Sequence, residues 1–152
     1  MKKFIFIIGI CIFFLGLGMS ACKSKEKVTT GDSSSSKTEN LVDKKWKLLE
    51  LNGVAISTMN PQQTIEAFIT FQANENRVSG NSGCNNFTGT YKLDSGNQLH
   101  FSGMASTRKM CIDMTVENQM NKIFQEVDSY TLQNGALSLK QGDTTLARFV
   151  AE

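Results

Sequence analysis

Apolar and polar residues alternate along most of the chain after residue 45, a pattern typical of strands that bury one face. Phe87, Gly89 and Tyr91, for example, alternate with Thr88 and Thr90. Comparable runs are separated by Asn, Gly and Asp residues, which favour tight turns. The runs cover residues 46–51, 54–56, 65–72, 77–80, 87–93, 98–101, 130–133, 136–140 and 145–150. From them we expect about eight short strands.

One segment breaks this alternation and has the period of a helix instead. Its apolar residues are Val116, Met120, Ile123, Phe124 and Val127. We predict an amphipathic helix of about three turns, which Asp113 or Thr115 caps at its start. Its polar residues belong to the opposite face, and we expect the carboxylates of Glu117, Glu126 and the neighbouring Asp128 to be solvated.

These elements together predict the fold class. Strands joined by turns this short pair antiparallel. No internal repeat is visible, so residues 43–152 are expected to form one domain. The predicted fold is mainly β: a small antiparallel, partly open barrel-like sheet with one amphipathic helix packed on it.

The first 21 residues are expected to be a signal peptide and not part of the fold. Two lysines precede an uncharged apolar run over residues 4–18, and Ser-Ala-Cys follows, with its cysteine at position 22. This is the order of a secretory signal, and the run is shorter than the roughly 20 apolar residues of a transmembrane helix. The end of the segment resembles a bacterial lipobox, which implies cleavage before Cys22 and a diacylglycerol on its sulfur. The alternative is an ordinary signal peptide with a coincidental cysteine.

Residues 22–40 are expected to comprise the lipidated cysteine and a disordered tether. From residue 23 onward the segment is rich in Lys, Ser, Thr, Glu, Gly and Asp, and Val28 is its one clear hydrophobe. Such a composition buries too little apolar surface to offset the entropy of ordering. The tether would reach on the order of 25 Å. Because Lys23, and not Asp, follows the cysteine, we expect a lipoprotein anchored in the outer membrane of the cell envelope.

The charge balance excludes one class of partner. The chain has 16 basic and 14 acidic residues, and loss of Lys2 and Lys3 with the signal leaves a formally neutral protein. Residues 43–152 contain 10 basic and 11 acidic residues, a net charge of −1. A domain without a basic stripe is not expected to bind nucleic acid.

Two of the four cysteines, Cys84 and Cys111, lie in the predicted domain. In an exported protein such a pair most often forms a disulfide. Closing a loop of about 28 residues would stabilise the domain by about 3.5 kcal/mol on the chain-entropy model. The alternatives are a reduced pair or a redox-active pair, although the Cys-X-X-Cys spacing of a redox motif is absent.

The stretch around Cys84 holds the candidate binding loop. Asn81, Asn85 and Asn86 lie on either side of Gly83 and Cys84. Their amides have two interpretations: they face a ligand from a loop, or they satisfy backbone groups within a tight turn. Similarly, the methionines of the next segment either line a groove for an apolar ligand or fill the core. These methionines are Met104, Met110 and Met114.

The sequence offers little for catalysis. Cys84 as a nucleophile would need a base, and the only histidine, His100, lies in a predicted strand between Leu99 and Phe101, whose side chains point the other way. A His and Cys cluster suited to zinc is missing, and the glycines between residues 80 and 89 lead into a strand instead of a helix. We therefore expect no catalytic residue, no metal site and no cofactor.

A family resemblance covers essentially the whole predicted domain. It rests on the initial Trp-X-Leu strand, on Val-Ser-Gly before Gly-Cys-Asn at residues 78–85, and on Met-Ala-Ser-Thr with Met-Cys at residues 104–111. Together these resemble the META domain, or HslJ-like, family. The resemblance implies a small antiparallel barrel-like fold with one helix, in heat-inducible or envelope-associated bacterial proteins, some of them linked to novobiocin resistance. It supplies no established catalytic residue, and a fold does not by itself carry a function.

Three hypotheses for function follow. The first is a lipid-anchored envelope protein that acts by binding or structural support in stress tolerance, with an envelope protein as its partner. The second is a carrier of a small apolar molecule, such as a hydrophobic antibiotic, which requires a cavity of roughly 300 Å³ or more. The third is a thiol-dependent redox enzyme, which requires a reactive Cys84.

Overall fold

The sheet of this protein closes on itself because its first and last strands pair. The computed structural model describes residues 40–61 and 66–152. The predicted signal peptide, Cys22 and the tether up to residue 39 therefore lie outside the described residues. Nine strands are formed within the described ranges: β1 (Lys45–Leu51), β2 (Val54–Ala55), β3 (Phe68–Gln72), β4 (Arg77–Asn81), β5 (Asn86–Asp94), β6 (Gln98–Ser106), β7 (Ser129–Gln133), β8 (Ala136–Gln141) and β9 (Thr144–Ala151).

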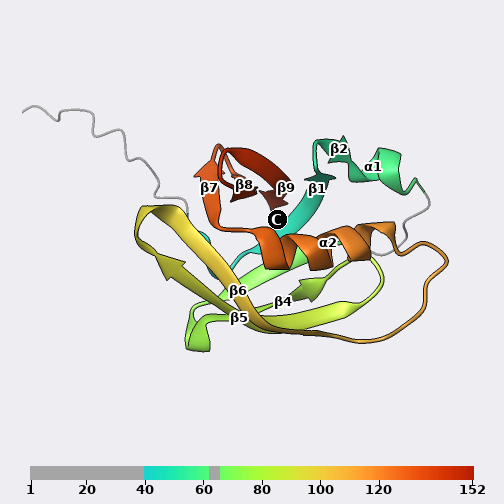
Figure 1. The fold of residues 1–152 in the computed structure, drawn as a ribbon, viewed down its shortest axis with the longest axis horizontal. Helices are drawn as coiled ribbons and strands as arrows, with labels where there is room; N and C mark the ends of the chain where they lie inside the picture. Colours follow the sequence, from blue (N-terminus) through green and yellow to red (C-terminus); the bar gives the residue numbers. More distant parts are fainter. Residues whose placement is uncertain (1–39, 62–65) are drawn as a thin grey trace, which may run out of the picture. The chain divides into compact units, whose positions relative to one another are not determined.

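All of the strand pairings are antiparallel. The order is β2-β1-β3-β4-β5-β6-β7-β8-β9, and an additional pairing of β1 with β9 completes a ring (Figure 1). The predicted mainly β, antiparallel fold class is thus confirmed, with nine strands in place of about eight. The shortest strand pairing in the ring is that of β6 with β7, which has the single residue pair Gln98–Ser129. The Leu99 N–H also donates to the Asp128 carbonyl there, at 3.0 Å.

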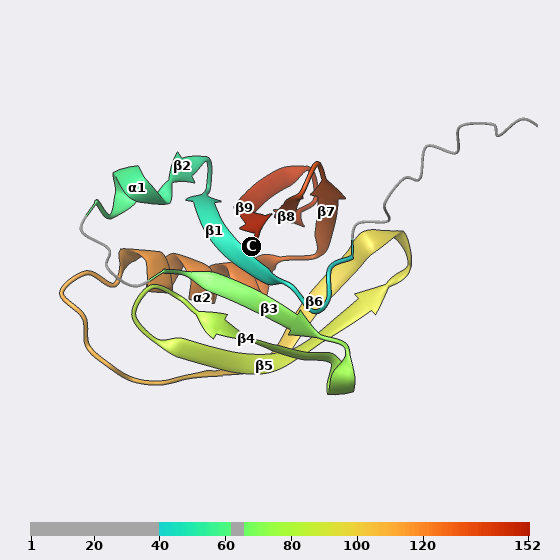
Figure 2. The same cartoon turned by 180° about the vertical axis from the view of Figure 1, so that it is seen from behind.

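The predicted amphipathic helix is confirmed as α2 (Thr115–Glu126), which lies between the β7–β9 part of the ring and the β4–β6 part in both views (Figures 1 and 2). It buries Val116, Met120, Ile123 and Phe124. Asp113 acts at its start, since its Oδ1 accepts the Thr115 N–H at 2.8 Å. Hydrogen bonds from Thr115 hold the pKa of Asp113 below its ordinary value.

A short helix was not predicted. The run at residues 54–56 was expected to be strand throughout, but the strand ends at Ala55 and α1 (Ile56–Met59) makes one helical turn. The predicted turns after β3 and β5 are present as the 3₁₀ turns η1 (Asn74–Asn76) and η2 (Ser95–Asn97). Each contains two residues with positive φ, Glu75 and Asn76 in η1 and Gly96 and Asn97 in η2.

The core lies inside the ring and under α2. Trp46, Phe71 and Phe149 are its largest fully buried side chains, and the Trp46 indole N–H donates to the Leu41 carbonyl at 2.8 Å. Aromatic rings connect the sheet to the helix. Their contacts are Phe71–Tyr91 at 5.2 Å, Phe71–Phe101 at 6.0 Å, Phe101–Phe124 at 5.1 Å and Phe87–Phe124 at 4.8 Å between ring centroids.

Two bulges bend the β1–β9–β8 part of the ring. In β1 the register with β9 shifts between Leu48 and Glu50, so that Leu49 is the extra residue. Because side chains alternate along a strand, this shift lets Leu51 point inward like Leu48 and sends Glu50 outward. In β9 the register with β8 shifts at Leu146. Bulges increase local twist and curvature, and residues beside both of them, Glu50 and Leu146, line a hollow on the outer face of the sheet.

Candidate functional site

The turn at residues 82–85 is closed by its own side chains. Ser82 donates to the Asn85 carbonyl through both its backbone N–H, at 2.9 Å, and its hydroxyl, at 3.0 Å. The Asn81 amide oxygen accepts the N–H of Gly83 at 2.7 Å, and Gly83 has a φ of 97°, which glycine adopts without strain. These bonds satisfy backbone groups within the turn, as the second of the two interpretations of the asparagines requires.

Asn85 connects the turn to two distant segments. Its side chain is buried, and its Nδ2 donates to the Lys109 carbonyl at 2.9 Å and to the two carboxylate oxygens of Glu117 at 2.9 and 3.1 Å. Its Oδ1 accepts the Thr107 hydroxyl and the Lys109 N–H, both at 2.7 Å. Its backbone N–H donates to Glu117 at 3.1 Å. Every polar atom of this side chain is thus used inside the protein.

The predicted disulfide between Cys84 and Cys111 is confirmed, with the two Cα atoms 6.1 Å apart. Cys84 is buried at 1% exposure, whereas Cys111 is half-buried. The bond and Asn85 together fix the segment between β6 and α2 against the turn.

The other two asparagines of the candidate loop are also engaged. Asn81 is buried, and its Nδ2 donates to the Oδ1 of Asn86 at 2.8 Å. Asn86 is exposed, but its N–H and its carbonyl both bond Thr107, the N–H to the threonine hydroxyl at 3.2 Å and the carbonyl to the threonine N–H at 2.9 Å. The structure therefore directs these amides toward one another and toward the neighbouring segment.

The expectation that Glu117 is solvated is wrong. Its side chain is 6% exposed and receives the Asn85 bonds at the first turn of α2, where the helix dipole favours a negative charge. The burial of Glu117 could have been predicted from the sequence. Glu117 precedes Met120 by three residues and Phe124 by seven, so helical phase places it on the buried face. The histidine considered for chemistry, His100, is exposed on β6.

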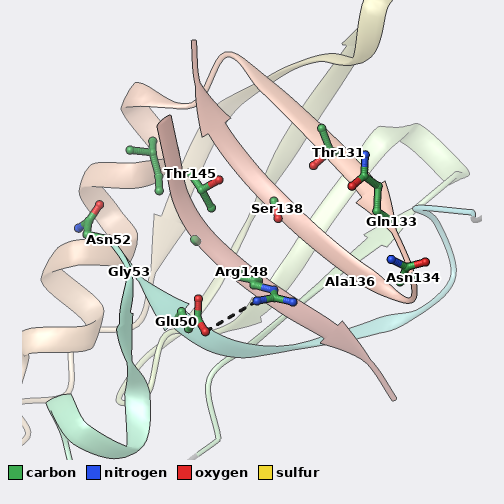
Figure 3. Close-up of a pocket in the computed structure, with 12 residues that line it drawn as sticks. Glu50, Asn52, Gly53, Thr131, Gln133, Asn134, Ala136, Ser138, Thr145 and Arg148 are labelled. Atoms are coloured by element: carbon green, nitrogen blue, oxygen red, sulfur yellow. Dashed lines mark ion pairs between the residues drawn. The ribbon is translucent and has the colours of Figure 1, made fainter. Parts of the chain in front are cut away.

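A polar hollow of about 400 Å³ lies on the outer face of the bent sheet (Figure 3). Strand register places four of its side chains in one row across β1, β9, β8 and β7, because Glu50 pairs with Arg148, Arg148 with Ser138, and Ser138 with Thr131. Further polar side chains complete the lining, among them Asn52, Gln133, Asn134 and Thr145. Sequence reasoning missed this site because the bulge in β1 is what turns Glu50 toward it.

Charges in this hollow balance within it. Arg148 Nη1 lies 3.9 Å from Glu50 Oε1, and both side chains remain partly exposed. The other polar groups of the lining are neutral hydroxyls and amides, which can donate as well as accept hydrogen bonds. Such a lining suits a small, uncharged ligand with many hydroxyl or amide groups.

A second hollow, of about 300 Å³, lies between α2 and the β5–β6 pair. Its apolar surface comes from Phe87, Met104 and Phe124, and Asn121 and Gln125 of α2 border it. Of the three methionines considered for an apolar groove, Met104 lines this hollow, whereas Met110 is 96% exposed. Met114 is half-buried at the start of α2.

Residues 40–61 and 66–152 contain neither a cluster suited to a metal ion nor a membrane-spanning helix. No group of three or more His, Cys, Asp or Glu side chains in these ranges is placed to hold a metal ion. No helix in the same ranges is both long and apolar enough to span a bilayer.

The fold is shared with known proteins. The family model of the META domain matches residues 39–152, while no curated protein matches the chain. An NMR structure of a protein from Burkholderia xenovorans is 22% identical with a TM-score of 0.61, over 88% of this chain and 99% of that one. A second NMR structure is 26% identical with a TM-score of 0.56, over 72% of this chain and 91% of that one. A DUF4847 family protein from Bacteroides vulgatus is 17% identical with a TM-score of 0.51, over 72% and 93%.

Proposed function

Since the chain belongs to the META domain family, we propose that it is a lipid-anchored, non-catalytic binding protein of the bacterial cell envelope with a role in envelope stress tolerance. Support for the anchor comes from the sequence, in which an apolar segment ends in Ser-Ala-Cys at position 22. The test is metabolic labelling with a palmitate analogue in the producing bacterium. Label should enter the wild-type chain and be lost in Cys22→Ser; equal labelling of the two would contradict the anchor.

The observation that carries a binding role is the polar hollow on the outer face of β1, β9, β8 and β7 (Figure 3). Its volume of about 400 Å³ falls at the lower end of the range of small-molecule sites. Most of its side chains stand on strands and the others on two-residue turns, so the site is held in shape before any ligand arrives.

The lining favours a ligand of the saccharide class. Arg148 and Glu50 offer charged donors and acceptors whose charges cancel, and Ser138 and Thr131 add hydroxyls in the same row. An N-acetylated amino sugar presents neutral hydroxyl and amide groups that match these partners. Amino-sugar polymers are also a major component of the bacterial envelope, where the anchor would hold the domain.

This proposal is tested with N,N′-diacetylchitobiose added to the isotope-labelled domain and followed by NMR. We expect shift changes centred on Ser138 and Arg148, and Arg148→Gln should weaken binding about tenfold, because hydrogen bonds to charged groups are among the stronger ones. Arg77→Gln is the matched control, since Arg77 also forms an exposed ion pair, at 3.7 Å with Glu75, outside the hollow. Equal weakening by both variants, or shift changes away from the hollow, would contradict the assignment.

The second hollow favours the alternative function, a carrier of a small apolar molecule. Phe87, Met104 and Phe124 give it an apolar surface, and its volume of about 300 Å³ meets the lower bound for a ligand site. The fluorescent probe 1-anilinonaphthalene-8-sulfonate would report on it, and Met104→Gln should abolish its emission. Emission that persists in Met104→Gln would argue against this carrier role.

The proposal of a non-catalytic protein is supported by the state of the cysteines. The sulfur of Cys84 is bonded to Cys111, and Cys84 is 1% exposed. A reactive cysteine sits in a partly exposed, electropositive setting with its thiolate free. Alkylation of the native domain with iodoacetamide should leave both cysteines unmodified; rapid modification of Cys84 would favour redox chemistry instead.

A further inference from the structure

Two large apolar side chains project from the segment between β6 and α2 into solvent. Met110 is 96% exposed and Ile112 is 110% exposed, whereas the other exposed large hydrophobic residues reach 43% at most. The segment, residues 107–114, runs along the outer edge of the domain in Figure 1. We call it the rim loop. Apolar side chains that are exposed close together, unlike ones scattered singly, can mark a site of interaction with a protein or a membrane.

The rim loop is fixed at points on both sides of Met110. The Lys109 N–H and carbonyl both bond the buried Asn85 side chain, at 2.7 and 2.9 Å. Cys111 is bonded to Cys84. Met110 therefore stands between two anchored neighbours, and Ile112 follows directly after the disulfide. Their exposed positions are part of the built structure, and holding them there before binding lowers the entropic cost of an encounter.

Positive charge accompanies these apolar side chains. Arg108 and Lys109 are exposed and precede Met110 directly. The one carboxylate of the loop, Asp113, is used at the start of α2, where it accepts the Thr115 N–H. Arg108, Lys109 and Asp113 give the rim loop a net charge of +1, in a domain whose residues 43–152 have a net charge of −1.

We infer that the rim loop docks on the surface of an anionic lipid bilayer. Met110 and Ile112 enter the interfacial layer, and Arg108 and Lys109 contact lipid phosphates. A bilayer interface accepts single apolar side chains without a shaped pocket, and basic residues beside them are attracted to anionic headgroups. A stable protein partner would need a much larger complementary patch than two side chains.

Docking of this kind is weak by itself and needs no lipid anchor to be detected. Two basic residues near an anionic surface each strengthen binding by about fivefold. The inference does not rest on the proposed anchor or on the polar hollow. If the anchor at Cys22 is present, it would raise the local concentration of the rim loop at the membrane and so favour docking further.

The experiment uses residues 40–152, because every residue of the core cluster lies between Leu41 and Phe149. Two solved structures that match 72% of this chain, about the length of this domain, are matched over 91% and 93% of their own length. The domain is sedimented with vesicles of equal parts phosphatidylglycerol and phosphatidylcholine, and with vesicles of phosphatidylcholine alone. We expect measurable binding to the anionic vesicles and at least tenfold less to the neutral ones.

Two double variants then test the rim loop. Met110→Ser with Ile112→Ser should reduce binding to anionic vesicles at least tenfold, and Arg108→Gln with Lys109→Gln should reduce it about 25-fold, the product of two fivefold steps. These residues are exposed, so the circular dichroism spectrum should not change.

The matched control is Leu93→Ser with Lys92→Gln, which removes an exposed apolar residue and an exposed lysine from β5. It should bind anionic vesicles like the wild type. Absence of wild-type binding, equal binding to both vesicle types, an equal loss in the control, or full binding by the Met110 and Ile112 variant would each overturn the inference.

Discussion

Asn85→Ala is the substitution that most directly tests how the site is held together. The amide of Asn85 is buried and bonds Glu117, Lys109 and Thr107. Removing it takes away the side-chain donor to the Glu117 carboxylate, and that side chain is only 6% exposed. The Asn85 backbone N–H is then the one donor from this turn that still bonds the carboxylate. It also releases the backbone of Lys109.

The magnitude follows from these partners. A hydrogen bond to a charged group contributes about 1.5–3 kcal/mol, and a neutral bond about 1 kcal/mol or less where water can replace it. The bonds to Lys109 and Thr107 are partly buried, so water can recover part of their energy. We expect Asn85→Ala to lower the free energy of unfolding by about 3–4 kcal/mol, a large part of the total for a small domain.

Urea unfolding of residues 40–152 under non-reducing conditions gives the measurement. Asn118→Ala is the control, because that side chain is exposed on α2 and its loss should change the free energy of unfolding by less than about 1 kcal/mol. In the double variant Asn85→Ala with Glu117→Leu the buried carboxylate is gone. The losses of unfolding free energy in the two single variants should therefore add up to about 2 kcal/mol more than the loss in the double variant. A loss below about 1 kcal/mol for Asn85→Ala, or strictly additive losses, would refute the reasoning.

Three further predictions concern stability. Reduction of the disulfide should lower the free energy of unfolding by about 3.5 kcal/mol on the chain-entropy model, visible as a lower urea midpoint in dithiothreitol; an unchanged midpoint would contradict it. Gly80→Ala should destabilise by about 2 kcal/mol or more, because a Cβ there would overlap the carbonyl oxygen of Phe68; thermal unfolding equal to wild type would show that the strands shift freely. The Ser129 hydroxyl and the Gly142 N–H hold the pKa of Asp128 below its ordinary value. The stability that these two hydrogen bonds contribute is therefore present above the unfolded pKa of about 4 and lost as the pH falls through the lower folded pKa. In Asp128→Asn the free energy of unfolding should accordingly depend less on pH in the acid range.

How much of this fold could be predicted depends on the range of the interactions involved. The alternation of apolar and polar residues predicted most strands, because a half-buried strand shows this period within its own sequence. The pairing of β1 with β9 joins the two ends of the domain, and no local pattern encodes it. The bulge at Leu49 is a shift between those same strands, so the polar hollow beside it could not be predicted from the sequence either.

The candidate site divides in the same way. The cysteine pair was predicted, because two cysteines in a domain that is expected to be exported most often form a disulfide. The burial of Glu117 was missed because charge was given more weight than helical phase, although its spacing from Met120 placed it on the apolar face. The exposure of Met110 and Ile112 could not be predicted from their apolar character. It accompanies the bond of the neighbouring Lys109 backbone to the Asn85 side chain, which the sequence does not reveal.

Pairing of β1 with β9 also brings the two ends of the domain together. The Glu152 N–H donates to the Lys45 carbonyl at 3.0 Å, and the two side chains form an ion pair at 2.7 Å. The ring therefore does not depend on where the chain begins. A circular permutant that joins these ends through a short linker and opens at the η2 turn keeps every strand pair. For the same reason the whole domain can be spliced into a surface loop of another protein, since the loop need not be stretched to receive it.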